Sequence, residues 1–116
     1  MEPAIDRDRL FDLLEDQPTL FDAVYQELAA EVPRQLTHIR AALAGRHDGA
    51  LATAAHRLRG AVASFYAIPC ATAAETLEEM GRSNDFAGTP EALARLEEEL
   101  DRLWTELRLV RQELLP

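Results

Sequence analysis

The chain has 116 residues, close to the usual size of one domain, so residues 1–116 are expected to form a single domain. Its 21 acidic and 12 basic residues give a formal net charge of -9, and a surface of that sign repels nucleic-acid phosphates and anionic lipid. We therefore expect neither nucleic acid nor a membrane as a partner. The single cysteine, Cys70, and the charged start MEPAIDRDRL favour a cytoplasmic location without a signal peptide.

Two helices are predicted in the first part of the chain. A short accessory helix is expected over about residues 6–15, because Asp16-Gln17-Pro18 then breaks the pattern. A long second helix is expected over about residues 19–44, because its apolar residues recur every three or four positions. These residues are Phe21, Val24, Leu28, Val32, Leu36, Ile39 and Leu43.

The third predicted helix follows a turn at residues 45–49, with Asp48 as its candidate N-cap. Ile68-Pro69 ends this helix, because the residue before a proline disfavours the α region. The apolar positions that mark its core face are Leu51, Ala55, Leu58, Val62 and Phe65.

Two more helices are predicted after Ile68. The fourth begins at Pro69 and runs to about Ser83, where the loop SNDFAGTP starts. The last helix has Thr89 as its candidate cap and Pro90 at its first position. Its apolar residues alternate steps of three and four, as in the seam of a helical bundle. They are Leu93, Leu96, Leu100, Leu103, Leu107, Val110 and Leu114.

The fold class follows from these stripes. Each of the four long helices has one apolar stripe to bury, and the connections between them are short. The pattern therefore predicts an all-α fold, an antiparallel four-helix bundle over about residues 18–114 with the short accessory helix packed against it. A single long coiled coil is the competing fold.

One histidine stands in the stretch AAHRLRGAVASFYA among small residues. At about 100° per residue, His56 lies roughly 140° from the core face and therefore faces solvent, with Ala52, Gly60 and Ala63 on the same side. A glycine in mid-helix costs about 1 kcal/mol relative to alanine, so Gly60 suggests close access by a partner. A neutral, accessible imidazole can accept a phosphoryl group, and Arg59 can pair with phosphate oxygens. By spacing alone, an ordinary surface histidine remains the alternative.

The same stretch resembles the signature of histidine-containing phosphotransfer (HPt) domains, roughly HxLKGS followed by a small apolar run. Here it reads His56-Arg57-Leu58-Arg59-Gly60-Ala61 and then Phe65-Tyr66-Ala67. The similarity covers about residues 18–112, because the Ala-rich run before the histidine, the acidic helix after it and the long terminal helix match the family's layout. The resemblance implies a four-helix bundle with an exposed histidine.

The resemblance also implies roles for individual residues. His56 would accept a phosphoryl group from the aspartate of one receiver domain and pass it to another in two-component signalling. Arg59 would stabilise the phosphate. The docking face for the receiver would include Ala52, Gly60 and Ala63.

Cofactors and partners follow from the same resemblance. The magnesium ion that phosphoryl transfer requires is expected on the partner receiver, so no cofactor is expected on this chain. We also expect the chain to have no ATP-dependent kinase activity of its own. His38, His47 and His56 are also too widely spaced for a metal site on one helix. Response-regulator receiver domains and a hybrid histidine kinase are the candidate partners, and the carrier is expected to be a monomer.

The chain departs from the family pattern at three positions. Arg59 replaces the usual lysine, which keeps the charge but presents a planar fork. Ala61 replaces a small hydroxyl residue and removes a hydrogen-bonding group. Tyr66 stands where glycine is usual, so its ring could cover part of the approach surface.

Two other functions remain open at this point. An HPt-like module could dock receivers or a kinase without carrying phosphate, and the Ala61 and Tyr66 replacements motivate that alternative. The apolar stripe of the last helix could instead serve an oligomerisation protein. The acidic residues Glu75, Glu78 and Glu79 are expected to be solvated, with orientation of the imidazole as the alternative.

Overall fold

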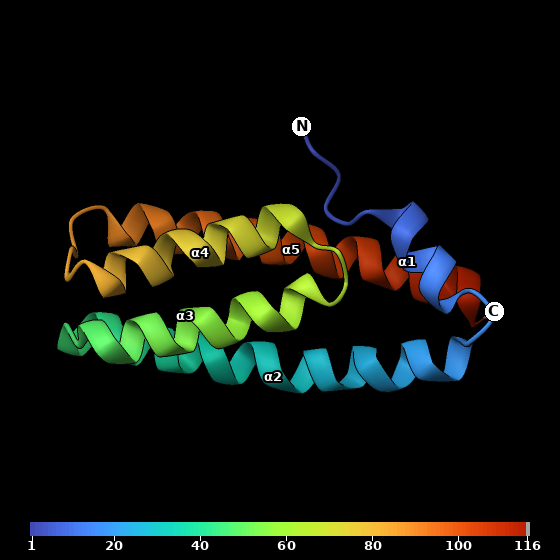
Figure 1. The fold of residues 1–116 in the computed structure, drawn as a ribbon, viewed down its shortest axis with the longest axis horizontal. Helices are drawn as coiled ribbons and strands as arrows, with labels where there is room; N and C mark the ends of the chain where they lie inside the picture. The colour runs from blue at the N-terminus through green and yellow to red at the C-terminus, as the bar shows by residue number, and fades with distance from the viewer. Residues whose placement is uncertain (116) are drawn as a thin grey trace.

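The computed structural model describes residues 1–115, which contain five α-helices and no β-strand. The helices are α1 (Arg7–Leu14), α2 (Pro18–Gly45), α3 (Asp48–Ala63), α4 (Ile68–Arg82) and α5 (Thr89–Leu114). Helices α2 to α5 run alternately in opposite directions, and each packs on the next, with α5 closing back on α2 (Figure 1). The predicted all-α bundle is confirmed, and the single long coiled coil is excluded.

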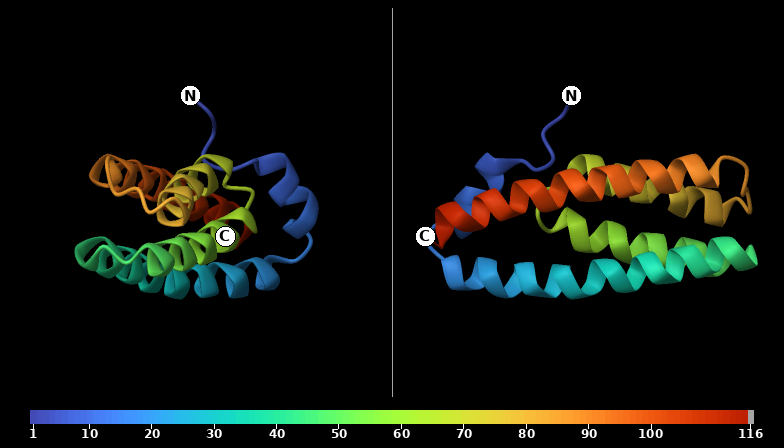
Figure 2. Two further views of the ribbon diagram at one scale, coloured as in Figure 1. Left: turned by 60° about the vertical axis from the view of Figure 1, so that its left-hand side comes forward. Right: turned by 180° about the vertical axis from the view of Figure 1, so that it is seen from behind.

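Helix α1 covers one end of the bundle. Helices α2 and α5, with 28 and 26 residues, are longer than α3 and α4, with 16 and 15, so their outer ends extend past the α3–α4 pair (Figure 2). Leu10 and Leu14 of α1 are buried at that end, and Arg7 pairs with Glu106 and Glu113 of α5. The accessory helix therefore closes the part of the core that α3 and α4 do not reach.

The core combines the apolar stripes of the helices, and that of α5 is buried within this chain. Leu93 and Leu114, at its two ends, are half-buried. The fully covered residues of the stripe are Leu96, Leu100, Leu103, Leu107 and Val110. The stripe that could have paired with a second chain is thus used inside the bundle. Among residues 1–115, none of the helices has the length and apolar character that crossing a bilayer requires.

Helix boundaries differ from the predicted ones by one or two residues, except that α3 ends at Ala63 instead of continuing to Ile68-Pro69. Two predicted caps are also wrong. Helix α3 begins at Asp48, so His47 takes the N-cap position, and the Asp48 carboxylate accepts the N–H of the next residue at 2.9 Å. Helix α5 begins at Thr89 after Gly88, whose φ is 77°, and Pro90 is its second residue. The Thr89 hydroxyl bonds back to a carbonyl of the preceding loop at 2.9 Å instead of capping the helix.

Helix α3 also ends before its apolar pattern does. Its last residue is Ala63, and Phe65 lies buried in the following turn. Tyr66 has a φ of 55°, in the left-handed region that favours glycine. Its carbonyl accepts the N–H of Asp6 at 3.0 Å, and the residue lines a groove with Ile68 and the segment before α1. The structure therefore places Tyr66 beside the N-terminal segment, away from the depression that His56 lines.

Candidate functional site

His56 lies in the middle of α3 and points outward. Its side chain is 59% exposed, which confirms the predicted orientation. Ala55 and Leu58, its near neighbours on the helix, are fully buried. Because these residues are packed in the core, the helix cannot rotate, and the direction of the imidazole is set by the bundle.

A buried carboxylate from α4 contacts the imidazole. Glu78 is 1% exposed, and its Oε2 lies 2.9 Å from His56 Nδ1. The same carboxylate pairs through Oε1 with Arg59 Nε of α3 at 2.9 Å, and through Oε2 with Arg82 of α4. A buried charge is costly without such partners. One carboxylate thus connects three partly exposed side chains from two helices.

Glu78 also determines which ring nitrogen is free. A carboxylate accepts but does not donate, so its hydrogen bond requires the proton on Nδ1. Arg59 Nη2 lies 3.0 Å from the same nitrogen, but a guanidinium only donates, so both contacts cannot be hydrogen bonds together. We assign the proton to Nδ1, because loss of a hydrogen bond costs more for the buried Glu78 carboxylate than for the partly exposed Arg59 guanidinium. Nε2 then carries the lone pair and has no hydrogen-bond partner within residues 1–115.

Close packing of α3 and α4 brings this carboxylate to the histidine. A Cβ at Gly81 would lie 2.6 Å from the backbone nitrogen of Ala52 and 2.8 Å from the carbonyl oxygen of Asp48. Only glycine permits this approach, since both neighbours are main-chain atoms. Gly81, less than one turn after Glu78, therefore sets the distance between the two helices at the site.

The small residues predicted to form the docking face lie around His56. Ala52 is half-buried and lines a shallow depression together with His56 and Arg82. Gly60 and Ala63 are exposed, and a Cβ at Gly60 would meet no atom within 4 Å. Their role in docking stays a prediction.

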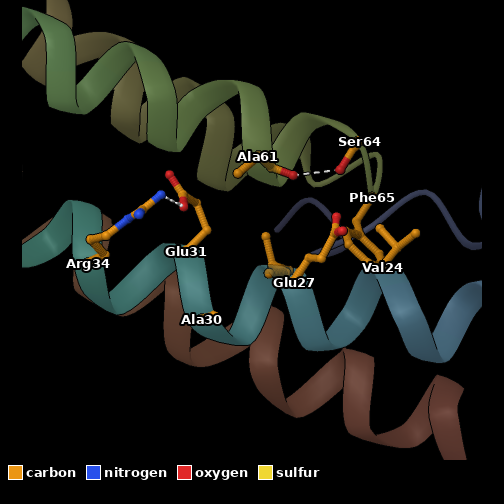
Figure 3. A pocket seen from close by; sticks show the side chains of 9 residues that line it. Val24, Glu27, Ala30, Glu31, Arg34, Ala61, Ser64 and Phe65 are labelled. Carbon is orange, nitrogen blue, oxygen red and sulfur yellow. Dashed lines mark hydrogen bonds and ion pairs between the residues drawn. The ribbon is translucent and has the colours of Figure 1, made fainter.

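A groove lies between α2 and α3, beside the exposed side of α3 (Figure 3). Its apolar lining comes from both helices and the turn after α3, namely Val24, Leu28, Ala30, Ala61 and Phe65. At about 100° per residue, Ala61 lies roughly 140° from His56 around α3, and Gly60 lies between them. A partner centred on Gly60 would therefore reach both the histidine and the groove.

The polar rim of this groove is held by local ion pairs. Glu31 accepts a hydrogen bond from Gln35 Nε2 at 2.8 Å. It also pairs with Arg34 (Figure 3). These contacts, with the charge of Arg57 on α3, lower the pKa of Glu31. The carboxylate therefore stays ionised at neutral pH and links α2 electrostatically to the helix that carries His56.

The expectation that Glu78 is solvated is wrong, while Glu75 and Glu79 are exposed as expected. A signal for Glu78 was present in the sequence, because it belongs to a stripe with the spacing i, i+3, i+4, i+7. The stripe consists of Ala74, Leu77, Glu78 and Gly81, and all four are buried. An acidic residue on a buried stripe indicates a partner on the neighbouring helix.

Comparison with known proteins gives the family. The model of the Hpt domain matches residues 23–106 of the 116-residue chain. The chain therefore belongs to the Hpt domain family, whose members take part in histidine phosphotransfer in two-component signalling. The matched range includes His56, Arg59, Glu78 and Arg82. No curated protein and no solved structure matches the chain.

Proposed function

We propose that this chain is a phosphorelay carrier in which His56 accepts a phosphoryl group from the aspartate of one receiver domain and passes it to another. The observation that supports this best is the hydrogen bond between Nδ1 of the exposed His56 and the buried Glu78. It holds the ring in one orientation and leaves Nε2 as the nucleophilic atom.

In the proposed step, the lone pair of His56 Nε2 forms a bond to phosphorus. The bond between phosphorus and the aspartyl oxygen of the receiver breaks, and its electron pair returns to that carboxylate. The ring keeps its Nδ1 proton and becomes a cation, which the adjacent carboxylate of Glu78 stabilises. A protonated ring is also the better leaving group, so the same contact supports transfer in the opposite direction.

Arg59 fits the role of the phosphate-stabilising residue. Its guanidinium lies 3.0 Å from the imidazole of His56, and its side chain is 34% exposed. A planar guanidinium can donate two parallel hydrogen bonds to phosphoryl oxygens. Catalysis would then consist largely of positioning and charge stabilisation, as is usual for phosphoryl transfer.

The proposed docking face is the exposed side of α3 around Gly60, with Ala63, the accessible part of Ala52 and the apolar groove beside α2. Helix α3 is the only helix of residues 1–115 with a positive formal charge, because it carries Arg57 and Arg59 against Asp48. Its charge is complementary to the acidic pocket of a receiver.

The proposal also assigns cofactors and partners. Magnesium belongs to the receiver, and within residues 1–115 no group of three or more His, Cys, Asp or Glu side chains is placed to hold a metal ion. Hpt domains typically interact with receiver domains and kinases. For this chain we propose response-regulator receivers and a hybrid histidine kinase as the partners. We propose that the chain binds them as a monomer in the cytoplasm.

The direct test is phosphoryl transfer from a panel of receivers charged with acetyl phosphate. We expect acid-labile, alkali-stable label on the wild type and on His38→Ala, whose histidine is an exposed residue of α2, and none on His56→Ala. Absence of label in spite of measurable receiver binding would contradict the carrier and support the docking module. Light scattering tests the oligomerisation alternative, which requires at least a dimer.

The docking face is tested separately with Gly60→Gln. Because a Cβ there meets no neighbour, we expect the bundle to stay folded while the longer side chain blocks the receiver and transfer is lost. Thr105→Gln, on an exposed position of α5, is the matched control. Transfer to Gly60→Gln at the wild-type rate, with unchanged helix content, would contradict close approach at this glycine.

A further inference from the structure

Two arginines share the buried carboxylate that contacts His56. Glu78 supplies one negative charge, and both Arg59 and Arg82 pair with it. With a neutral imidazole, these four side chains have a net charge of about +1, and the exposed Glu79, which also pairs with Arg82, brings the sum to about zero. A single guanidinium balances the carboxylate of Glu78, and Arg82, the more exposed of the two arginines, also pairs with the exposed Glu79.

Arg82 lies close enough to act on a group attached to His56. Its guanidinium and His56 Nδ1 contact the same oxygen, Glu78 Oε2, so the two are no more than two hydrogen-bond lengths apart, about 6 Å. Arg82 and His56 also line the same shallow depression, and the Arg82 side chain is 54% exposed. Its other contact is with the exposed Glu79, at 2.9 Å. Because more than half of this side chain is exposed, its guanidinium can leave Glu78 without entering the core.

Phosphorylation changes which cation Glu78 needs. Once Nε2 carries a phosphoryl group, the ring with its Nδ1 proton is itself a cation in contact with Oε2 of Glu78. The carboxylate then has the ring and Arg59 as partners, and Arg82 is no longer required. At the same time a phosphoryl group with a charge near -2 has appeared beside Arg82.

We propose that Arg82 is a second phosphoryl-binding residue of this site, held by Glu78 before phosphorylation and released to the phosphoryl group when the ring becomes the counter-ion of Glu78. This inference rests on the proposed function. It adds a residue from α4 that the sequence motif on α3 does not contain. Arg59 and Arg82 would then contact the phosphoryl group from the two helices that flank it.

The test uses chemical phosphorylation, which needs no receiver. In a His38→Gln, His47→Gln background, His56 is the only histidine. Phosphoramidate transfers its phosphoryl group to the imidazole, with formation of the N–P bond and departure of ammonia. Phosphorus NMR then follows the ionisation of the attached phosphoryl group with pH. A nearby guanidinium favours the dianion and so lowers the pKa of that group.

We expect Arg82→Gln to raise the pKa of the phosphoryl group by about 1, with Arg82→Lys closer to the wild type. Arg40→Gln removes the same charge from an exposed pair with Glu97, between α2 and α5, and should leave the phosphoryl pKa unchanged. Equal phosphoryl pKa values for folded Arg82→Gln and Arg40→Gln would overturn the inference. If Arg82→Gln shifts the phosphoryl pKa but no receiver transfers a phosphoryl group to the wild type, the proposed function is contradicted and the inference about Arg82 stands.

Discussion

Two buried glutamates of this bundle, Glu78 and Glu99, have the same kind of partners in different arrangements. Their residues are 1% and 4% exposed, and each carboxylate pairs with two arginines. Glu99 contacts Arg95 at 3.3 Å and Arg102 at 2.7 Å, and all three lie on α5. The Glu99 cluster is therefore held by one helix.

The Glu78 cluster is built across two helices and includes an exposed histidine. A buried carboxylate with two arginines is thus by itself a structural feature, as at Glu99. We expect a chemical role for it only where a second helix brings a nucleophile to the same carboxylate. The following predictions test that difference.

The largest difference is expected between Glu78→Gln and Glu99→Gln. Loss of the charge beside the imidazole removes a charge-assisted hydrogen bond, worth about 1.5–3 kcal/mol, so transfer to Glu78→Gln should fall about 10- to 100-fold. Glu99→Gln should transfer at nearly the wild-type rate. The check is the initial rate of labelling from one charged receiver. Equal rates for the two variants would show that the Glu78 cluster is no more than structural.

Gly81→Ala should damage the interhelical cluster and leave the single-helix cluster intact. Its Cβ would lie 2.6 Å from a backbone atom of α3, so the helices must separate, at a cost of about 1–3 kcal/mol in the free energy of unfolding. Urea unfolding measures this loss, and the transfer rate should fall with it. Gly60→Ala is the control, since its Cβ is unobstructed and alanine favours the helix by up to about 1 kcal/mol. If Gly81→Ala is as stable as the wild type, the close contact does not set the helix spacing.

A smaller effect is expected at Arg59. Arg59→Lys keeps the charge found at this position in the family pattern, so the transfer rate should stay within about threefold of the wild type. Arg59→Gln removes both the charge and the fork, and the rate should fall about tenfold. Arg102→Gln, in the Glu99 cluster, is the matched loss of an arginine. Similar rates for Arg59→Gln and Arg102→Gln would argue against a role for Arg59 in phosphate binding.

The smallest effect concerns the thiol of Cys70. Burial, and secondarily the charge of Glu99, raise the pKa of Cys70 to about 12, so little thiolate forms in the native protein and iodoacetamide should react slowly at about pH 8. Glu99→Gln removes the negative charge, which is the smaller of the two causes, and so lowers the pKa of the thiol slightly. Labelling should then increase by no more than a few fold. Glu78→Gln should not change it. Rapid labelling of the native wild type would contradict the burial of this thiol.

Much of the fold could be predicted because helical periodicity is a local property. The steps of three and four along α2 and α5 placed both helices to within one or two residues. The exposure of His56 followed from the same rule, applied to a single helix. The caps at Asp48 and Thr89 were wrong because the backbone direction at a helix end depends on the turn before it, including the left-handed Gly88.

The site was only half predictable. His56, Arg59 and Gly60 belong to one stretch of α3, so their common side could be derived from the angle per residue. Glu78 and Arg82 lie on α4, and whether an acidic side chain there is solvated or buried depends on what faces it. The spacing of Glu78 with Leu77 and Gly81 was an available signal, although it could not show which residue of α3 it would meet.

The sequence by itself determined the helices and the outward direction of His56, because each depends on residues within a single segment. It also determined the resemblance to the Hpt family, because a motif and the order of helices along the chain are read without knowing how the helices pack. The tertiary structure alone decided that Glu78 contacts His56 and brings Arg82 beside it. That contact depends on the spacing of α3 and α4, which the contact between Gly81 and the backbone at Ala52 sets. Contacts between helices are a property of the packed bundle, and no pattern within one helix specifies them.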